Sequence, residues 1–217
     1  MALATFPSRP AEGSYNAPCL PSRMLGRVLD ILRYKFSRPS SILRAELKDL
    51  IWTTDHQTSK IVIVPGFEAA PGNDIANVFP RLTVDLGEFQ KVPHMSPIAD
   101  DDAMTYGGGS DDGFHGSTKH HATFQSSVSI TAASLSGMEA LAIAEDVLIT
   151  LLMFKAEIRD SLQLTHLDVN LLKGPLKNEG PPFCLIAGVR MVWAASIIWD
   201  LVPDGLPLVE SSHPASI

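Results

Sequence analysis

The sequence has few cysteines, no long hydrophobic run and no excess of positive charge. Its two cysteines, Cys19 and Cys184, are too few to build a disulfide framework or a zinc cluster on their own. No window approaches the roughly 20 apolar residues that span a bilayer, and the N-terminus lacks the charged start and apolar run of a secretory signal. We therefore expect a soluble protein of a reducing compartment, without a membrane partner, in the cytoplasm where it is made.

Charge and composition bound the partners and the domain count. The net charge of -7 and the sequence pI of about 5.4 argue against a nucleic-acid surface, which depends on clustered Lys and Arg. Hydrophobic residues make up 45% of the 217 positions, enough for a buried core. We expect an extended, proline-rich arm at 1–22, a single α+β domain at 23–203 and a loose tail at 204–217.

Hydrophobic spacing predicts a mostly antiparallel sheet with a long helix packed on one face. Apolar residues at helical spacing predict an N-terminal helix over 22–37 and a second, short helical piece over 41–50. The second and third strands alternate apolar and polar residues and are expected to pair as a hairpin with a long loop. The strands are predicted at 61–64, 81–89, 124–130, 167–171 and 183–196.

A capping signal marks the start of the long helix. Ser136 and Glu139 form the S-x-x-E pattern, in which both side chains bind free amides at a helix start. The apolar stripe continues to about residue 162, which gives a helix of roughly 37 Å at 1.5 Å per residue. Glu145 and Asp146 fall on the side that we expect to face water.

A glycine- and proline-rich stretch at 93–121 has no hydrophobic period. Such a long connection is uncommon in a compact domain, so we expect a functional excursion or a disordered tip. Asp100, Asp101 and Asp102 are interpreted first as a solvated acidic patch, because the residue spacing of a calcium loop is missing.

The same stretch contains the one cluster with metal-ligand chemistry. His115, His120 and His121 lie near Asp111 and Asp112, and imidazoles with carboxylates bind divalent ions. Histidines in a Gly- and Ser-rich loop also occur without any ligand, and a solvated loop is the first interpretation.

No recognisable catalytic motif is present. The sequence has no G-x-S-x-G elbow, and neither cysteine has a histidine near it in the chain. The GGGSDDG segment lacks the G-K-[ST] ending of a phosphate-binding loop. We therefore expect no enzyme activity, no catalytic residue, no cofactor and no metal. The alternative is a metal-dependent hydrolase that uses the His/Asp loop.

The last strand ends in two tryptophans, Trp193 and Trp199, which flank two isoleucines. They are interpreted as core or edge aromatics, with interface anchors as the alternative, because tryptophan is enriched at binding hot spots. The opposite face of this strand holds Cys184, Arg190 and Val192 and is largely apolar. We expect a helix or another subunit to cover that face.

Three segments carry a resemblance to a known family: PRLTVDL, SSVSITAAS followed by an acidic helix, and GVRMVWAASIIWDL. In this order, residues 24–202 resemble the tail-terminator proteins of long-tailed bacteriophages, also called tail completion or head–tail joining proteins. The resemblance implies a structural virion protein that forms a hexameric ring at the head-proximal end of the tail tube and joins it to the neck. Such a ring is assembled in the host cytoplasm.

The resemblance also implies partners. They are further copies of the chain, the tail tube protein and neck or connector proteins, while DNA passes through the lumen without specific binding. Another neck or head-closure component is the alternative within the same class. The interface residues that we expect are Arg190, Trp193, Trp199, Asp100, Asp101, Asp102 and His115.

Overall fold

The computed structural model shows an α+β protein, as predicted, with one sheet and three α-helices in its described part. The structure describes residues 19–55, 57–69, 77–92, 103–105, 118–172, 175–177 and 184–201. The chain divides into a large unit, Pro18–Val92 with Thr123–Ser196, and a small unit made of Met1–Ala17, Pro93–Ala122 and Ile197–Ile217. Residues 1–18 of the predicted arm, most of the 93–121 stretch and the tail lie outside the described residues. The end of the arm is corrected, because α1 already begins at Pro21 and Cys19 is buried.

The described sheet has the strand order β1-β2-β5-β8-β6. These strands are β1 Val62–Pro65, β2 Arg81–Leu86, β5 Thr118–Ser134, β8 Leu185–Leu201 and β6 His166–Leu171. The pairs β2–β5 and β6–β8 are antiparallel, as the alternation predicts, whereas β1 pairs parallel to β2. Two short strands, β3 Gln90–Lys91 and β7 Leu176–Lys177, pair antiparallel with β5 and β8.

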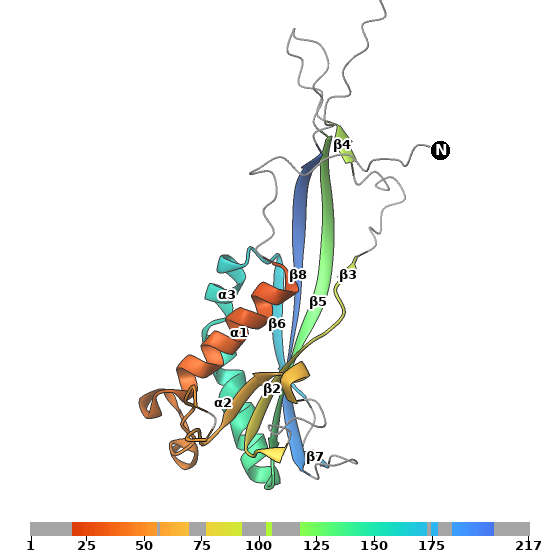
Figure 1. Ribbon diagram of the computed structural model, residues 1–217. Helices are drawn as coiled ribbons and strands as arrows, with labels where there is room; N and C mark the ends of the chain where they lie inside the picture. Colours follow the sequence, from red (N-terminus) through yellow and green to blue (C-terminus); the bar gives the residue numbers. More distant parts are fainter. Residues whose placement is uncertain are drawn as a thin grey trace, which may run out of the picture. The chain divides into compact units, whose positions relative to one another are not determined.

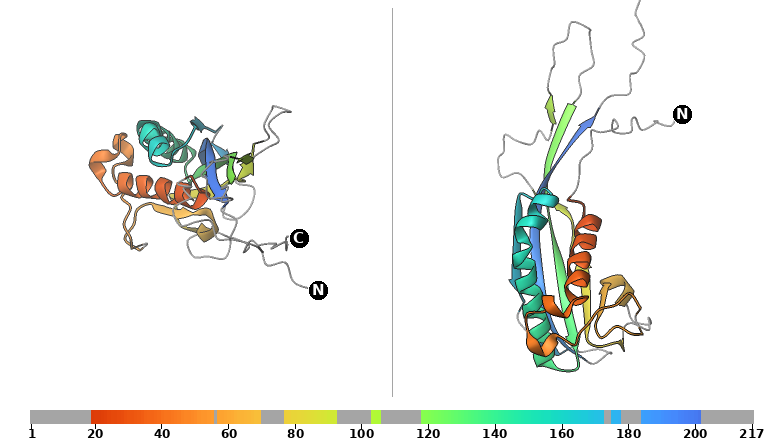
Figure 2. Two further views of the ribbon diagram at one scale, coloured as in Figure 1. Left: turned by 90° about the horizontal axis from the view of Figure 1, so that it is seen from above. Right: turned by 90° about the vertical axis from the view of Figure 1, so that its left-hand side faces the viewer.

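Three α-helices, α1 Pro21–Phe36, α2 Gly137–Met153 and α3 Lys155–Ser161, pack on one face of this sheet (Figures 1 and 2). α1 contacts β1 and β2, while α2 and α3 contact β6. The prediction of a long helix on one face and of an N-terminal helix is confirmed. None of the helices in the described part combines the length and the apolar character that a membrane crossing requires.

The predicted capping signal starts α2. Ser136 Oγ accepts a hydrogen bond from the Glu139 amide at 3.4 Å. The Glu139 carboxylate does not bind the Ser136 amide directly. Ser134 Oγ links the two: it donates to the Glu139 carboxylate and accepts from the Ser136 amide at 3.1 Å. Three side chains therefore fix the turn from β5 into α2.

The long helix does not continue unbroken to residue 162, which corrects the prediction. It ends at Met153, because Phe154 after it has a ψ of 1°, outside the helical range, and α3 begins at Lys155. One turn earlier, Thr150 Oγ1 donates to the Asp146 carbonyl at 2.7 Å. Such a bond from a threonine to the backbone four residues before it weakens and bends helices.

The core lies between the helices and the sheet. An aromatic cluster fills one part of it: Phe89 stacks on Phe124 with ring centroids 4.8 Å apart, and its centroid lies 5.6 Å from that of the fully buried Trp193. Around it, alternate residues of the strands face the helices. Fully or almost fully buried examples are Leu82, Val84, Val128, Ile130, Val169, Val189 and Met191.

A buried ion pair joins α1 to α2 and corrects the prediction that Asp146 faces water. Lys35 Nζ lies 2.9 Å from Asp146 Oδ2, in ion-pair but not hydrogen-bond geometry, and both side chains are almost wholly buried. Asp146 Oδ1 accepts from the Leu43 amide at 3.3 Å, and Lys35 Nζ donates to the Ser41 carbonyl at 3.1 Å. The two charges thus hold the chain after α1 against α2.

That anchored segment is not the short helix predicted over 41–50. It contains two single turns of 3-10 helix, η1 Pro39–Ser41 and η2 Ala45–Leu47. Between them the backbone is extended at Ile42 and Arg44, because the Leu43 amide binds Asp146 instead of a carbonyl of its own turn. A tertiary contact therefore overrides the local helical spacing.

Several strand boundaries also differ from the prediction: β8 runs on to Leu201 instead of ending at 196, and β5 runs on to Ser134 instead of ending at 130. β2 ends at Leu86, which is 40% exposed and not part of the core. From Leu86 to Gln90 the chain advances four residues while β5 advances three, from Val128 to Gln125, so one extra residue forms a bulge. In the small unit, β5 already begins at Thr118 and pairs with β4 Ala103–Thr105, inside the stretch predicted to lack structure.

Candidate assembly surface

The face of the sheet that α1, α2 and α3 do not cover is called the open face here. Leu82 and Val84 point to the helices, so their neighbours Thr83 and Asp85 point to the open face. Their register partners on β5, Thr131 and Ser129, lie on the same face. Most side chains of the central strands on this face are small or polar. Members on the central strands are Ser127, Ser129, Thr131, Ala133, Gly188, Arg190, Val192 and Ser196, of which Ser127, Ala133 and Gly188 are buried in the single chain.

Arg190 is the exposed cation in the middle of β8. Its Nη2 donates to Ser127 Oγ at 3.4 Å, and its register partner on β6 is Asn170. Asn170 Nδ2 donates to Asp168 Oδ2 at 2.9 Å, and this bond is the main reason why the pKa of Asp168 is lowered. Lys155 Nζ lies 3.7 Å from the same carboxylate. This part of the face therefore carries fixed charges of both signs.

A hollow of about 90 Å³ lies on the open face beside β7. Leu176, 59% exposed, and Leu172, 40% exposed, supply its apolar wall. A Cβ atom at Gly188 would lie 3.1 Å from Leu172 Cδ1, so the glycine lets the leucine lie close to the strand. The remaining lining residues are Thr131, Ile186 and Ala187.

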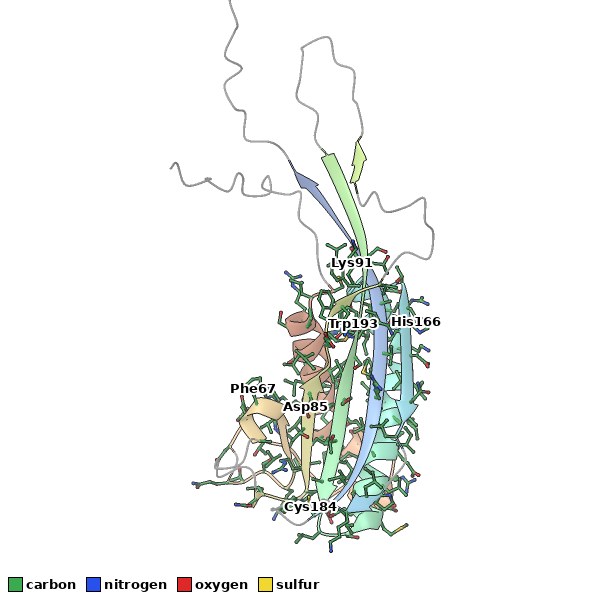
Figure 3. The ribbon with its side chains drawn as sticks, turned by 90° about the vertical axis from the view of Figure 1, so that its right-hand side faces the viewer. Phe67, Asp85, Lys91, His166, Cys184 and Trp193 are labelled. Carbon is green, nitrogen blue, oxygen red and sulfur yellow. The ribbon has the colours of Figure 1, made fainter. Side chains whose placement is uncertain are left out.

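A short 3-10 helix, η3 Gly66–Ala69, contacts β1 and β2 and presents Phe67, which is 72% exposed. Gly66 packs against the carboxylate of Asp85, which is labelled with Phe67 in Figure 3, and any Cβ at Gly66 would overlap Oδ1. Partial burial raises the pKa of Asp85. No element was predicted for this segment, although an aromatic residue directly after the Pro65-Gly66 turn is a signal that the sequence contains.

The helix side has a separate cleft between α1 and the junction of α2 with α3. Its volume is about 370 Å³, and an ion pair between Arg27 and Glu157 bridges it. Tyr34 of α1 and Phe154 at the helix junction add aromatic walls. Asp30 and Ile31 complete the lining.

The structure places the predicted interface residues in different surroundings. Arg190 is exposed on the open face, whereas Trp193 is fully buried in the aromatic cluster, which is the core position that the sequence analysis put first. Trp199 belongs to β8 in the small unit, and its side chain is not described. Asp100, Asp101, Asp102 and His115 lie outside the described residues. In the described ranges, no three His, Cys, Asp or Glu side chains come together as metal ligands.

Comparison with known proteins adds no relative: no family model matches the sequence, and no curated protein matches it significantly. The surface therefore has to be interpreted from its own geometry.

Proposed function

We propose that the chain is a structural subunit that joins its sheet to copies of itself in a closed ring, and that the ring is a phage tail terminator. The observation that carries the proposal is the half-covered sheet. The described α-helices pack on one face, and the other presents exposed leucines around a hollow together with a protruding phenylalanine. Apolar groups left exposed side by side mark surfaces that a partner chain covers.

Two unlike edges support a ring. In the described sheet the terminal strands are β1 and β6, which differ in length, sequence and neighbours. Contacts between unlike surfaces repeat from copy to copy and close into a ring when the rotation permits. The sequence resemblance supports the tail-terminator type, because a capped long helix followed by the final strand is the family's order of elements.

The proposed ring sits in the virion, after assembly in the host cytoplasm. It binds the tail tube protein on one side and neck or connector proteins on the other. DNA passes through its lumen, and the net charge of -7 supports a channel that does not retain DNA.

Native mass spectrometry and negative-stain imaging of the purified full chain test the proposal. The expected result is a six-fold ring with about six times the subunit mass of 23.4 kDa. A chain that stays monomeric at every concentration contradicts the proposal, and a ring of another symmetry favours another neck or head-closure component. Stoichiometric zinc or manganese that is lost on replacing His115, His120 and His121 would favour the metal enzyme instead.

A further inference from the structure

The two terminal strands of the described sheet differ in how they are covered. The Val and Ile side chains of β1 are at most 1% exposed, and the outward carbonyl of Ile63 accepts a hydrogen bond from Arg33 Nη2 at 3.2 Å. Arg33 in turn stacks over Trp52 at 5.5 Å. At the opposite end of the sheet, β6 has exposed residues such as Leu171 and His166, which is labelled in Figure 3. The outer side of β6 is called the open edge here.

The backbone groups that point to the open edge follow from the pairing of β6 with β8. The Leu172 amide donates to the Gly188 carbonyl at 2.7 Å, so this pair is hydrogen-bonded and every second residue of β6 before it also bonds to β8. The residues between them direct their N–H and C=O groups away from β8. They are Leu167, Val169 and Leu171. In the described ranges, no backbone group binds these outward amides and carbonyls.

The surroundings of Asp168 confirm this direction for Val169. The pKa of Asp168 is lowered first by the side chain of Asn170 and then by the amide of Val169, so that amide points to the carboxylate and not into β8. The Asp168 side chain is 48% exposed, and another acceptor can replace it at the amide. A row of outward N–H and C=O groups on an extended strand binds one kind of partner, which is a further β-strand.

The sequence of β6 is complementary to itself. In an antiparallel pair centred on Val169, that residue faces its own copy, Leu167 faces Leu171 of the copy, and Asp168 faces Asn170 of the copy. Asn170 Nδ2 already donates to Asp168 Oδ2 of its own strand at 2.9 Å, so each carboxylate would accept from two amides. A pair centred on Asp168 would instead place two carboxylates opposite each other, which is destabilising.

The helix above β6 supplies an apolar flank on the same side. α2 contacts β6, whereas α1 contacts β1 and β2 (Figures 1 and 2). Asp146 of α2 faces α1 through its ion pair, and Leu148 lies about 200° further round the helix, on the flank away from α1. Leu141 and Leu152 fall on that flank too, and Leu152 is 46% exposed. A two-fold axis at Val169 would bring these leucines against their copies.

We infer that two free chains pair through β6, antiparallel about a two-fold axis at Val169, so that the two sheets join and each α2 packs on the other. The occupant of the open edge is a second copy of this chain. The inference goes beyond the proposed ring, because a contact with two-fold symmetry ends at two copies, whereas a ring needs contacts between unlike surfaces. The pair is the state of the free chain before ring assembly.

Sedimentation velocity of the full chain, at concentrations below those that give larger assemblies, tests the inference. The unchanged chain should be a dimer of about twice 23.4 kDa. Val169→Pro removes the central outward amide and no bond to β8, and proline is tolerated at such edge positions, so this variant should be a folded monomer. Circular dichroism checks its fold.

Two neighbouring residues of α2 give a matched test of the helix flank. Leu152→Ser should raise the dissociation constant of the dimer roughly tenfold, since an exposed part of a leucine leaves water on pairing. Met153→Ser is the control: Met153 is more exposed, at 71%, but it follows Asp146 by seven residues and therefore lies on the side of α1. It should pair like the unchanged chain. Equal weakening by both variants overturns the contact between the two α2 helices.

An exchange of two side chains tests the register. Asn170→Asp should weaken pairing, because it places a carboxylate opposite Asp168 of the copy. Adding Asp168→Asn in the same chain should restore pairing, since each carboxylate again faces an amide. If the double variant pairs no better than Asn170→Asp alone, the axis does not lie at Val169 and the inference is wrong.

The outcomes separate the pair from the ring. An unchanged chain that is monomeric at low concentration, or a folded Val169→Pro chain that still dimerises, overturns the inference. If such chains form the six-fold ring at higher concentration, the proposed function stands without the pair. A dimer that is lost in Val169→Pro and never grows into a ring supports the inference and contradicts the proposed function.

Discussion

The two faces of the sheet in the large unit are built for different tasks. The face under the helices buries Trp193, Met191 and Ile130 completely or almost completely. The open face carries short hydroxyl side chains, Arg190 and an apolar hollow that no described helix fills. Folding of the single chain depends on the first face, because most of the apolar area leaves water there. The second face is the one that we propose for association.

We expect the largest loss of folding stability from a substitution in the aromatic cluster of the helix-covered face. Trp193→Ala should lower the free energy of unfolding by up to about 5 kcal/mol, since it leaves a large cavity next to Phe89 and removes buried area. Ser129→Ala, on the open face, should change it by less than about 0.5 kcal/mol. Urea unfolding followed by circular dichroism measures both. Similar losses for the two variants would show that the faces contribute equally to folding.

The buried ion pair on the helix side should give the next largest effect. Asp146→Ala leaves Lys35 without its carboxylate in the interior and should cost about 3 kcal/mol, even though Lys35 keeps the Ser41 carbonyl. The double variant Lys35→Met with Asp146→Leu should recover most of that loss, because neither buried charge remains. A double variant as unstable as Asp146→Ala would mean that the Leu43 amide contact, and not the charge, holds the segment.

We expect the smallest change in stability from a substitution of Asp85 on the open face. Its folded-state pKa is raised above the ordinary value of 3.8 by burial, so its contribution to stability is present below pH 3.8 and is lost as the pH rises through the raised pKa. Asp85→Asn should therefore raise the melting temperature at neutral pH, and the gain should vanish towards pH 3.8. If the melting temperature rises by the same amount at all pH values, the gain does not come from removing the carboxylate charge.

Local signals in the sequence predicted much of the fold. The cap at Ser136, the start of α1 and the alternation in β2, β6 and β8 all depend on residues within a few positions of one another, so they can be recognised without a structure. The same alternation put Arg190 on the face opposite the buried Trp193. The parallel pairing of β1, the break at Phe154 and the bulge after Leu86 were not predicted, because each depends on packing across elements.

The candidate surface was predicted less well than the fold. Its hollow exists because Leu172 lies over Gly188 and Leu176 pairs opposite Ile186, contacts between segments that a turn separates. Phe67 follows Gly66, which lies against Asp85 of β2 with no room for a Cβ. A sequence pattern of two or four residues contains none of these contacts.

By itself, the sequence determined which segments become helix or strand and which side of each strand is apolar, since these properties follow from the spacing of neighbouring residues. Only the tertiary structure decided that Asp146 is buried against Lys35, through contacts that reach 103 positions along the chain to Leu43. It also decided that α1 packs on the same face of the sheet as α2 and α3 (Figure 2). Such choices depend on which surfaces fit together in space, because burial is a property of the packed chain and not of any short segment.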